Sequence, residues 1–123
     1  MKVAIVGSRG LTVTDFGKYL PKECDEIVSG GARGIDSCAE EYARKKGLKV
    51  TVFLPEYEKY GKVAPLKRND QIADYADEVI AFWDGESRGT MYTVKQFQRL
   101  GKKITLLRSV KKFGIFPTWQ GEE

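Results

Sequence analysis

The stretch Val3-Ala4-Ile5-Val6-Gly7-Ser8-Arg9-Gly10 decides the fold of this chain. Four consecutive apolar residues are typical of a strand that is buried on both faces, as the central strands of a parallel sheet are. The glycines of the turn that follows allow its backbone to approach a ligand closely. The stretch therefore predicts a central parallel strand that ends in a candidate binding turn.

Further apolar runs alternate with segments of helical period along the rest of the chain. Strands are expected at 26–29, 48–54, 77–83 and 104–107. Helices are expected from Ile35 to a cap at Gly47, from about Pro65 to Ala76, and from the turn at 87–90 to Gly101, with a weaker amphipathic stretch at 15–20 and an irregular loop at 56–64.

This alternation is the pattern of an α/β domain with a parallel sheet. We therefore predict that residues 1–107 form a single Rossmann-like, doubly wound domain of about five mostly parallel strands with helices on both faces. Residues 108–123 show no clear period. They are interpreted as a C-terminal tail that packs on the domain or on a partner in a homo-oligomer.

Composition excludes several classes of function. The chain has 123 residues, 41% of them hydrophobic and 31% charged, as expected for one globular domain. It has no His, and Cys24 and Cys38 do not have metal-ligand spacing, which argues against zinc chemistry and against Ser-His or Cys-His catalysis. The net charge of +4 is only a mild bias toward anionic partners. With no apolar run of about 20 residues, we expect a cytoplasmic protein without a membrane span.

Three turns at predicted strand ends are rich in Gly, Ser, Thr and Arg. They are Gly7-Ser8-Arg9-Gly10, Ser29-Gly30-Gly31-Ala32-Arg33-Gly34 and Ser87-Arg88-Gly89-Thr90. Helix N-termini supply free N–H donors, and arginine suits phosphate oxygens. Any one such turn is also explained as a tight connection. Because the C-terminal ends of parallel strands share one edge of the sheet, the three together predict a pocket for an anion.

Other residues near these turns have a structural and a functional interpretation. Asn69 falls within the apolar stripe of its helix, next to Arg68, and either ties down the loop at 55–64 or faces a ligand. Asp36 either complements the helix dipole or accepts a hydrogen bond from a ribose hydroxyl. Trp83, Tyr57 and Tyr60 are either ordinary packing aromatics or surfaces for stacking a base.

The order and spacing of these motifs resemble those of the SLOG superfamily, which joins the Smf/DprA proteins to the LOG phosphoribohydrolases, and in particular its small single-domain YspA-like branch. The resemblance spans about residues 1–107. It implies a Rossmann-like fold and a nucleotide or nucleotide-derived ligand. Carried over residue by residue, the implied site comprises Gly7, Ser8, Arg9, Gly30, Gly31, Arg33, Gly34, Arg68, Asn69, Ser87, Gly89 and Thr90.

Two departures from the family patterns bear on activity. LOG enzymes carry a catalytic Glu three residues after the Thr of their glycine motif, and here that position is Thr93. This argues against cleavage of an N-glycosidic bond by that mechanism. Smf/DprA proteins follow Gly-Ile-Asp with an Ala-His pair, here Ala39-Glu40, and carry extra domains, which argues against a role in DNA recombination.

Three functions follow from this site, in decreasing order of preference. The first is binding of a phosphorylated nucleotide by a sensor or processing domain, with Arg9, Arg33 or Arg88 on the phosphate. The second is hydrolysis of a nucleoside monophosphate at its N-glycosidic bond, with Asp36, Asp84 or Glu86 as the carboxylate. The third is binding of single-stranded nucleic acid. The sequence identifies no cofactor.

Overall fold

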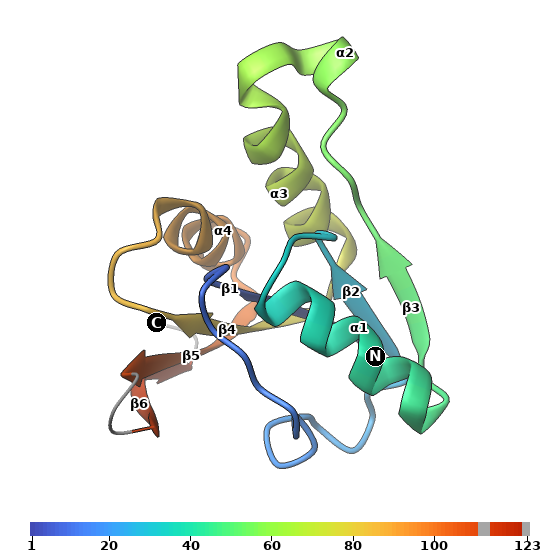
Figure 1. Cartoon of the computed structure of the whole chain (residues 1–123), viewed down its shortest axis with the longest axis vertical. Coiled ribbons are helices and arrows are strands. Elements are labelled where there is room, and N and C mark those ends of the chain that lie inside the picture. The colour runs from blue at the N-terminus through green and yellow to red at the C-terminus, as the bar shows by residue number, and fades with distance from the viewer. Residues whose placement is uncertain (111–113, 122–123) are drawn as a thin grey trace.

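The computed structural model describes residues 1–110 and 114–121, with side chains described as far as Arg108 (Figure 1). One six-stranded sheet forms its centre, in the order β3-β2-β1-β4-β5-β6. The first five strands are parallel, and β6 pairs antiparallel with β5. The strands are β1 Lys2–Gly7, β2 Glu26–Ser29, β3 Lys49–Val52, β4 Glu78–Trp83, β5 Lys103–Val110 and β6 Gly114–Gly121.

The helices occupy both faces of this sheet, as in a doubly wound domain. They are α1 Ile35–Lys46, the short α2 Tyr57–Tyr60, the 3-10 turn η1 Gly61–Val63, α3 Ala64–Tyr75 and α4 Arg88–Arg99. Helix α1 covers one face, while α3 and α4 lie side by side on the other (Figure 1). The predicted single α/β, Rossmann-like fold is confirmed.

The strand order reverses between β1 and β4, and this position matters for function. The chain first builds outward from β1 to β3 and then returns to place β4 on the other side of β1. In the register of that pair, Gly7 lies opposite Phe82, so both strands end at the same level. The reversal leaves a crevice at the C-terminal ends of the two strands, where ligands of such folds bind.

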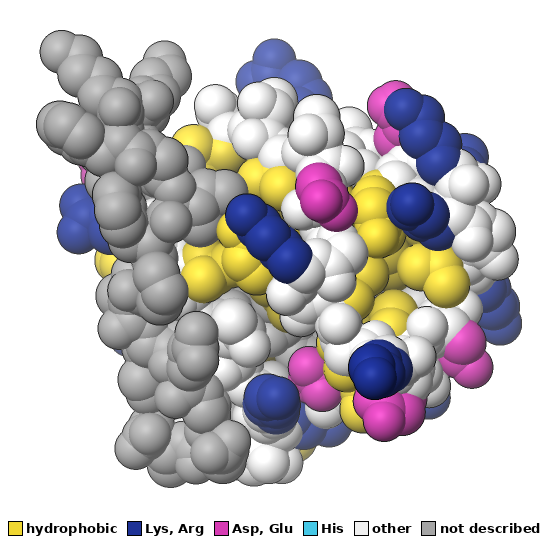
Figure 2. All heavy atoms as spheres, turned by 90° about the horizontal axis from the view of Figure 1, so that it is seen from below, with side chains coloured by type: hydrophobic (Ala, Val, Ile, Leu, Met, Phe, Trp, Pro, Cys, Tyr) yellow, Lys and Arg dark blue, Asp and Glu magenta, His cyan; other side chains and the backbone are white. Residues whose placement is uncertain are grey.

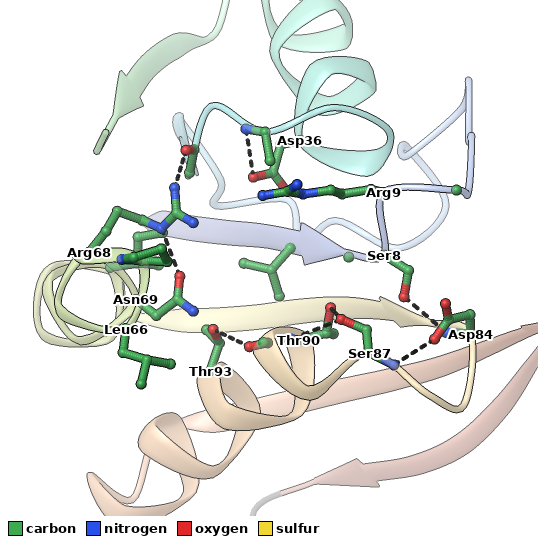
Figure 3. A pocket seen from close by; sticks show the side chains of 18 residues that line it. Ser8, Arg9, Asp36, Leu66, Arg68, Asn69, Asp84, Ser87, Thr90 and Thr93 are labelled. Carbon is green, nitrogen blue, oxygen red and sulfur yellow. Dashed lines mark hydrogen bonds between the residues drawn. The ribbon is translucent and has the colours of Figure 1, made fainter. Parts of the chain in front are cut away.

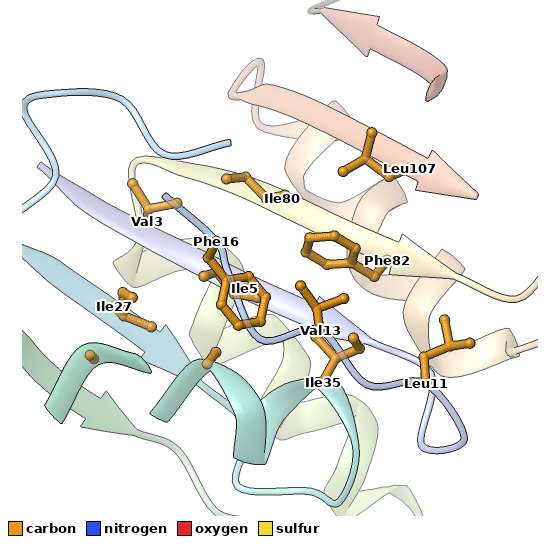
Figure 4. Packing of buried hydrophobic residues seen from close by; sticks show 12 residues of the cluster. Val3, Ile5, Leu11, Val13, Phe16, Ile27, Ile35, Ile80, Phe82 and Leu107 are labelled. Atoms are coloured by element: carbon orange, nitrogen blue, oxygen red, sulfur yellow. The ribbon is translucent and has the colours of Figure 1, made fainter. Parts of the chain in front are cut away.

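Alternation along the strands divides the core between the two faces. Val3 and Ile5 of β1 face α1 (Figure 4), whereas Ala4 and Val6 pack with residues of α3 and α4 on the other face. Each of these side chains is at least nine-tenths buried. A strand buried in this way needs an unbroken apolar run, and the residues from Val3 to Val6 supply it.

The segment between β1 and β2 differs from the prediction. Residues 15–20 were expected to form an amphipathic stretch, but they form turns, and the Asp15 carboxylate accepts a hydrogen bond from the Gly17 N–H at 2.9 Å. Phe16 is fully buried and packs edge-on against Phe82, with ring centroids 5.5 Å apart. Together with Leu11 and Val13, it covers the sheet beside α1 without forming a helix (Figure 4).

Two other segments are more regular than predicted. The loop expected at 56–64 contains α2 and η1, which were missed because neither has a buried residue and so neither shows a period. Residues 114–121, part of the expected tail, form strand β6, and β5 continues to Val110 to pair with it. How the tail's side chains pack lies outside the described residues.

The surface carries charges of both signs, as expected from the small net charge of +4. Basic and acidic side chains are interspersed on the face seen in Figure 2, with apolar side chains visible between them. No helix in the described part of the chain combines the length and apolar character needed to cross a bilayer.

A glycine is required at position 34, at the start of α1, because the backbone of the turn after β1 lies very close to it. Its φ is +76°, and a Cβ added there would lie 2.4 Å from the Arg9 carbonyl oxygen. The loop after β2 therefore presses directly on the turn after β1. Gly47, the cap at the other end of α1, has a φ of +72° but nothing within 4 Å of an added Cβ.

We expect Gly34→Ala to lower the free energy of unfolding by about 3 kcal/mol or more, because strain and collision with rigid backbone add together. Gly47→Ala should cost only about 1–2 kcal/mol, the penalty of a left-handed conformation alone. Urea denaturation of both variants measures the difference. Equal losses would contradict the close packing of the two turns.

Candidate functional site

A cavity of about 460 Å³ opens at the C-terminal ends of β1 and β4 (Figure 3). Its walls come from the turn after β1, the start of α1, the first half of α3, and the turn between β4 and α4. The lining residues are Val6, Gly7, Ser8, Arg9, Gly10, Gly30, Ala32, Asp36, Pro65, Leu66, Arg68, Asn69, Ile72, Asp84, Ser87, Gly89, Thr90 and Thr93.

Hydrogen bonds fix the turn after β1 to the turn after β4. The Ser8 N–H donates to the Phe82 carbonyl at 3.0 Å, and the Ser8 hydroxyl accepts from the Asp84 N–H at 3.1 Å. The Asp84 carboxylate in turn accepts from the N–H groups of Glu86 and Ser87, each at 2.8 Å. Partial burial acts to raise the pKa of Asp84, but these backbone donors outweigh it and lower the pKa. Asp84 is therefore charged, and it holds the turn in shape.

The start of α4 lies at the cavity and has backbone N–H groups without a hydrogen-bond acceptor among the described residues. The Ser87 hydroxyl caps the helix by accepting from the Thr90 N–H at 3.3 Å. The N–H groups of Arg88 and Gly89 have no acceptor among the described residues, and the same holds for Arg9 and Gly10 in the turn after β1. We call these two turns, residues 8–10 and 87–90, the amide cradle. Free N–H groups at a helix N-terminus favour an anion.

The opposite wall is organised by the buried Arg68. Its guanidinium donates from Nη1 to the carbonyls of Gly30 and, at 3.5 Å, Phe53, and from Nε to the Asn69 Oδ1 at 2.7 Å. Arg68 is only 9% exposed, and this burial lowers the pKa of the guanidinium. The contacts tie α3 to the loops after β2 and β3, so Arg68 serves the structure while one side of it faces the cavity.

Asp36 faces the cavity from the first turn of α1. Its Oδ2 accepts from the Ala32 N–H at 3.2 Å, and the Gly30 N–H also acts to lower the pKa of this carboxyl. The residue is 6% exposed, and burial raises the pKa of the carboxyl to about 6, against the opposing effects of the Ala32 N–H and of the Arg68 charge. Arg9 extends from its turn toward Asp36 (Figure 3).

Gly30 allows Asp36 and Arg68 to lie beside each other. A Cβ at this position would lie 2.9 Å from the Arg68 Nη1 and 3.0 Å from the Asp36 Oδ2. Glycine is thus needed here for space, not for an unusual φ. This is the physical reason for the glycine in the predicted turn after β2.

The structure brings together most of the predicted site residues. The lining includes Gly7, Ser8, Arg9, Gly30, Asp36, Arg68, Asn69, Ser87, Gly89 and Thr90, and also the candidate carboxylate Asp84. Outside it lie Gly31, Arg33, Gly34, Arg88 and the other candidate carboxylate, Glu86.

The residues outside the cavity have other surroundings. Gly31 is exposed, and a Cβ there would lie only 2.5 Å from the Leu54 side chain, so Gly31 packs closely against the residues at the end of β3. Arg33 and Arg88 are exposed to solvent. The Trp83 indole donates to the Ser87 carbonyl at 3.0 Å and so supports the start of α4. Neither Trp83 nor Tyr57 and Tyr60 line the cavity.

Other lining residues were not predicted from the sequence. Ala32, Pro65, Leu66 and Ile72 are apolar and gave no signal, because nothing in the sequence distinguishes them from core or surface positions. Thr93 is buried, and its hydroxyl donates to the Gly89 carbonyl at 3.0 Å. Its spacing of one helical turn from Thr90 was the available signal. Among the described residues, no group of His, Cys, Asp and Glu could hold a metal ion.

The burial of Asp36 makes a pH-dependent prediction. Because its pKa is higher in the folded than in the unfolded protein, the folded state holds an extra proton between about pH 4 and 6, and stability falls as the pH rises through that window. Asp36→Asn avoids this loss. We compare the free energy of unfolding of the variant with that of the wild type by urea denaturation. We expect this difference to favour the variant by about 2 kcal/mol more at pH 7.5 than at pH 4.5. A difference independent of pH would contradict a buried carboxyl.

Comparison with known proteins finds a family match for the N-terminal part of the chain, which contributes part of the cavity lining. Residues 1–60 match the family model described as DNA recombination-mediator protein A. Gene 61 protein of Mycobacterium phage D29 is 37% identical over 81 residues, which are 61% of this chain and 65%, or less than two thirds, of that protein. No solved structure matches the chain significantly. The resemblance to the SLOG superfamily is thus confirmed through its Smf/DprA group over residues 1–60, from β1 to the end of α2, which are similar to the DNA recombination-mediator protein A family.

Proposed function

We propose that this chain binds a phosphorylated nucleotide in the cavity between β1, α1, α3 and α4, as a sensor or processing domain. The observation that carries the proposal is the amide cradle at one side of a cavity of about 460 Å³. That volume lies within the range of small-molecule sites. The phosphate is assigned to the cradle, where the N–H groups of the lining residues Arg9, Gly10 and Gly89 lack acceptors among the described residues.

The charges of the lining favour one phosphate over several. Arg9 and Arg68 contribute two positive charges, and Asp36 and Asp84 contribute two carboxyl groups. A polyphosphate or a run of backbone phosphates would meet both carboxylates. A nucleoside monophosphate needs one anionic subsite and places hydroxyl and base groups elsewhere. The mixed lining therefore supports a ligand of that size and charge.

Binding is proposed in preference to cleavage of the N-glycosidic bond. Thr93 stands where LOG enzymes have a catalytic Glu, and its hydroxyl is bonded to the Gly89 carbonyl. Asp84 is engaged by two backbone N–H groups, and Glu86 lies outside the cavity. The third candidate, Asp36, lines the cavity and accepts a hydrogen bond from the Ala32 N–H.

Arg9 and Arg88 provide a matched test of the cradle. Both are exposed arginines of the cradle turns, but only Arg9 lines the cavity. We expect Arg9→Ala to weaken binding of nucleoside 5′-monophosphates at least tenfold in calorimetric titration, since a charged hydrogen bond contributes about 1.5–3 kcal/mol. Arg88→Ala should change affinity by less than about threefold. Equal losses in the two variants would place the phosphate outside the cavity.

Binding of single-stranded DNA is the second candidate, because the matching family model describes a DNA recombination mediator. Such binding neutralises several phosphates, so the logarithm of affinity should fall steeply with the logarithm of salt concentration, by about 0.7 per phosphate. Under the nucleotide proposal, we expect a dT12 oligonucleotide to bind no more tightly than a mononucleotide between 50 and 200 mM NaCl, as measured by fluorescence anisotropy and calorimetry. Tight oligonucleotide binding with a steep salt slope would favour the DNA function instead.

A further inference from the structure

Exposed apolar side chains gather on one part of the surface, along the chain from β3 to the start of α3. Among the described residues, seven large hydrophobic side chains are exposed, and five of them lie in this segment. We call these five the arm surface: Val52, Leu54, Tyr57, Val63 and Leu66. Apolar residues scattered singly over a surface are ordinary, whereas a cluster of them marks an interaction site.

The segment that carries the arm surface projects from the domain. After β3 the chain continues to α2 and η1 and returns along α3, so that α2 and the start of α3 extend beyond the other elements (Figure 1). Neither α2 nor η1 contains a buried residue, and Ala64 is the only buried residue at 49–67. Helices in proteins are stabilised mainly by packing of an apolar face. A partner that covers this segment supplies the packing that its own domain does not.

The arm surface continues onto an open edge of the sheet. Strand β3 is the outermost strand on its side, and it pairs with β2 alone within the described part of the chain. The free side of such a strand presents backbone N–H and C=O groups that can pair with another chain. Val52 belongs both to β3 and to the arm surface. A partner can therefore make hydrogen bonds at the edge and apolar contacts along the arm.

The charges beside the arm surface indicate which kind of partner fits. Glu56 and Glu58 share this segment with Lys59, Lys62 and Lys67, and all five side chains are exposed. A nucleic acid or an anionic membrane would meet the two carboxylates. A second copy of this chain, placed about a two-fold axis, presents the same two signs of charge, so acidic side chains of one copy can face basic side chains of the other.

We propose that the arm surface is the interface of a homodimer, in which a second copy of this chain packs its own arm surface against the first about a two-fold axis. The same residues then contribute from both copies. The segment 49–67 comes close to the roughly 20–30 residues a side of a standard interface. The proposal is independent of the proposed function, because it concerns a surface and not the ligand of the cavity.

The dimer places the partner copy at the rim of the cavity. Leu66 belongs to the arm surface and also lines the cavity. Burial lowers the pKa of the Arg68 guanidinium in the cavity wall, and Tyr57 of the arm surface is close enough to act against this effect. The partner therefore covers the α3 side of the rim, and the cavity of the monomer is more open than that of the dimer.

Sedimentation equilibrium of the full chain tests whether the dimer forms. Between about 1 and about 300 µM protein, the range of a weak to moderate association, we expect the mass to rise to twice the 13.9 kDa of one chain. A mass of one chain at every concentration would overturn the proposal.

Leu54→Lys and Leu100→Lys form a matched pair that tests where the interface lies. Both leucines are exposed, by 62% and 45%, but only Leu54 belongs to the arm surface. In a two-fold interface each substitution occurs twice, so Leu54→Lys removes two apolar side chains and adds two positive charges. We expect the dissociation constant of the dimer to rise at least tenfold in Leu54→Lys and to change by less than about threefold in Leu100→Lys. Equal effects of the two substitutions would overturn the proposal.

Val63→Lys tests the same surface from a second element, because Val63 lies in η1. It should weaken the dimer to a similar degree, and thermal denaturation of each variant establishes that it is folded. A dimer that withstands both Leu54→Lys and Val63→Lys is held together elsewhere, for example through residues 108–123, and the proposal is then wrong. Since no nucleotide enters these measurements, failure of the proposed function leaves their outcome unchanged.

Discussion

The buried guanidinium of Arg68 is the interaction on which the shape of the cavity depends. Burying such a charge costs free energy, and the structure offsets that cost with acceptors on the loops after β2 and β3 and on Asn69. The bonds to Gly30 and Phe53 join α3 to other parts of the chain, and the bond to Asn69 lies within the helix. The loop after β2 is thereby fixed where Gly30 has no side chain, and Asp36 is brought beside the positive charge that partly offsets its burial. A lysine could not reproduce this, because only the guanidinium donates in several fixed directions.

The fold and the location of the cavity could be predicted because both depend on local sequence patterns. A run such as Val3–Val6 has few alternatives to a buried parallel strand, and the C-terminal ends of parallel strands necessarily share an edge. The turns at Gly7, Gly30 and Ser87 follow β1, β2 and β4, which are neighbours or near neighbours in the sheet. Their convergence follows from topology alone, without knowledge of any side-chain contact.

The orientation of individual side chains could not be predicted in this way. Arg33 and Arg88 occupy the same kind of turn as Arg9, yet both lie outside the cavity lining, because direction depends on backbone angles that composition does not determine. The apolar lining residues and the short helix α2 could not be predicted, because their sequences do not differ from those of ordinary surface or core positions. Gly31 was expected at the ligand, but an added Cβ there would lie 2.5 Å from the Leu54 side chain, and its φ is +73°, so close packing and backbone conformation account for this glycine.

The family match and the cavity divide the chain differently, and this limits what can be transferred from relatives. Residues 1–60 supply the turn after β1, which is half of the cradle, together with Gly30 and Asp36. The other half of the cradle, at Ser87–Thr90, and Asn69 come from residues outside the matched segment. Any ligand that fills the cavity must contact both parts. Under the proposed function, specificity is set jointly by residues 1–60 and by α3 and α4, and a relative that shares only the first 60 residues need not bind the same molecule.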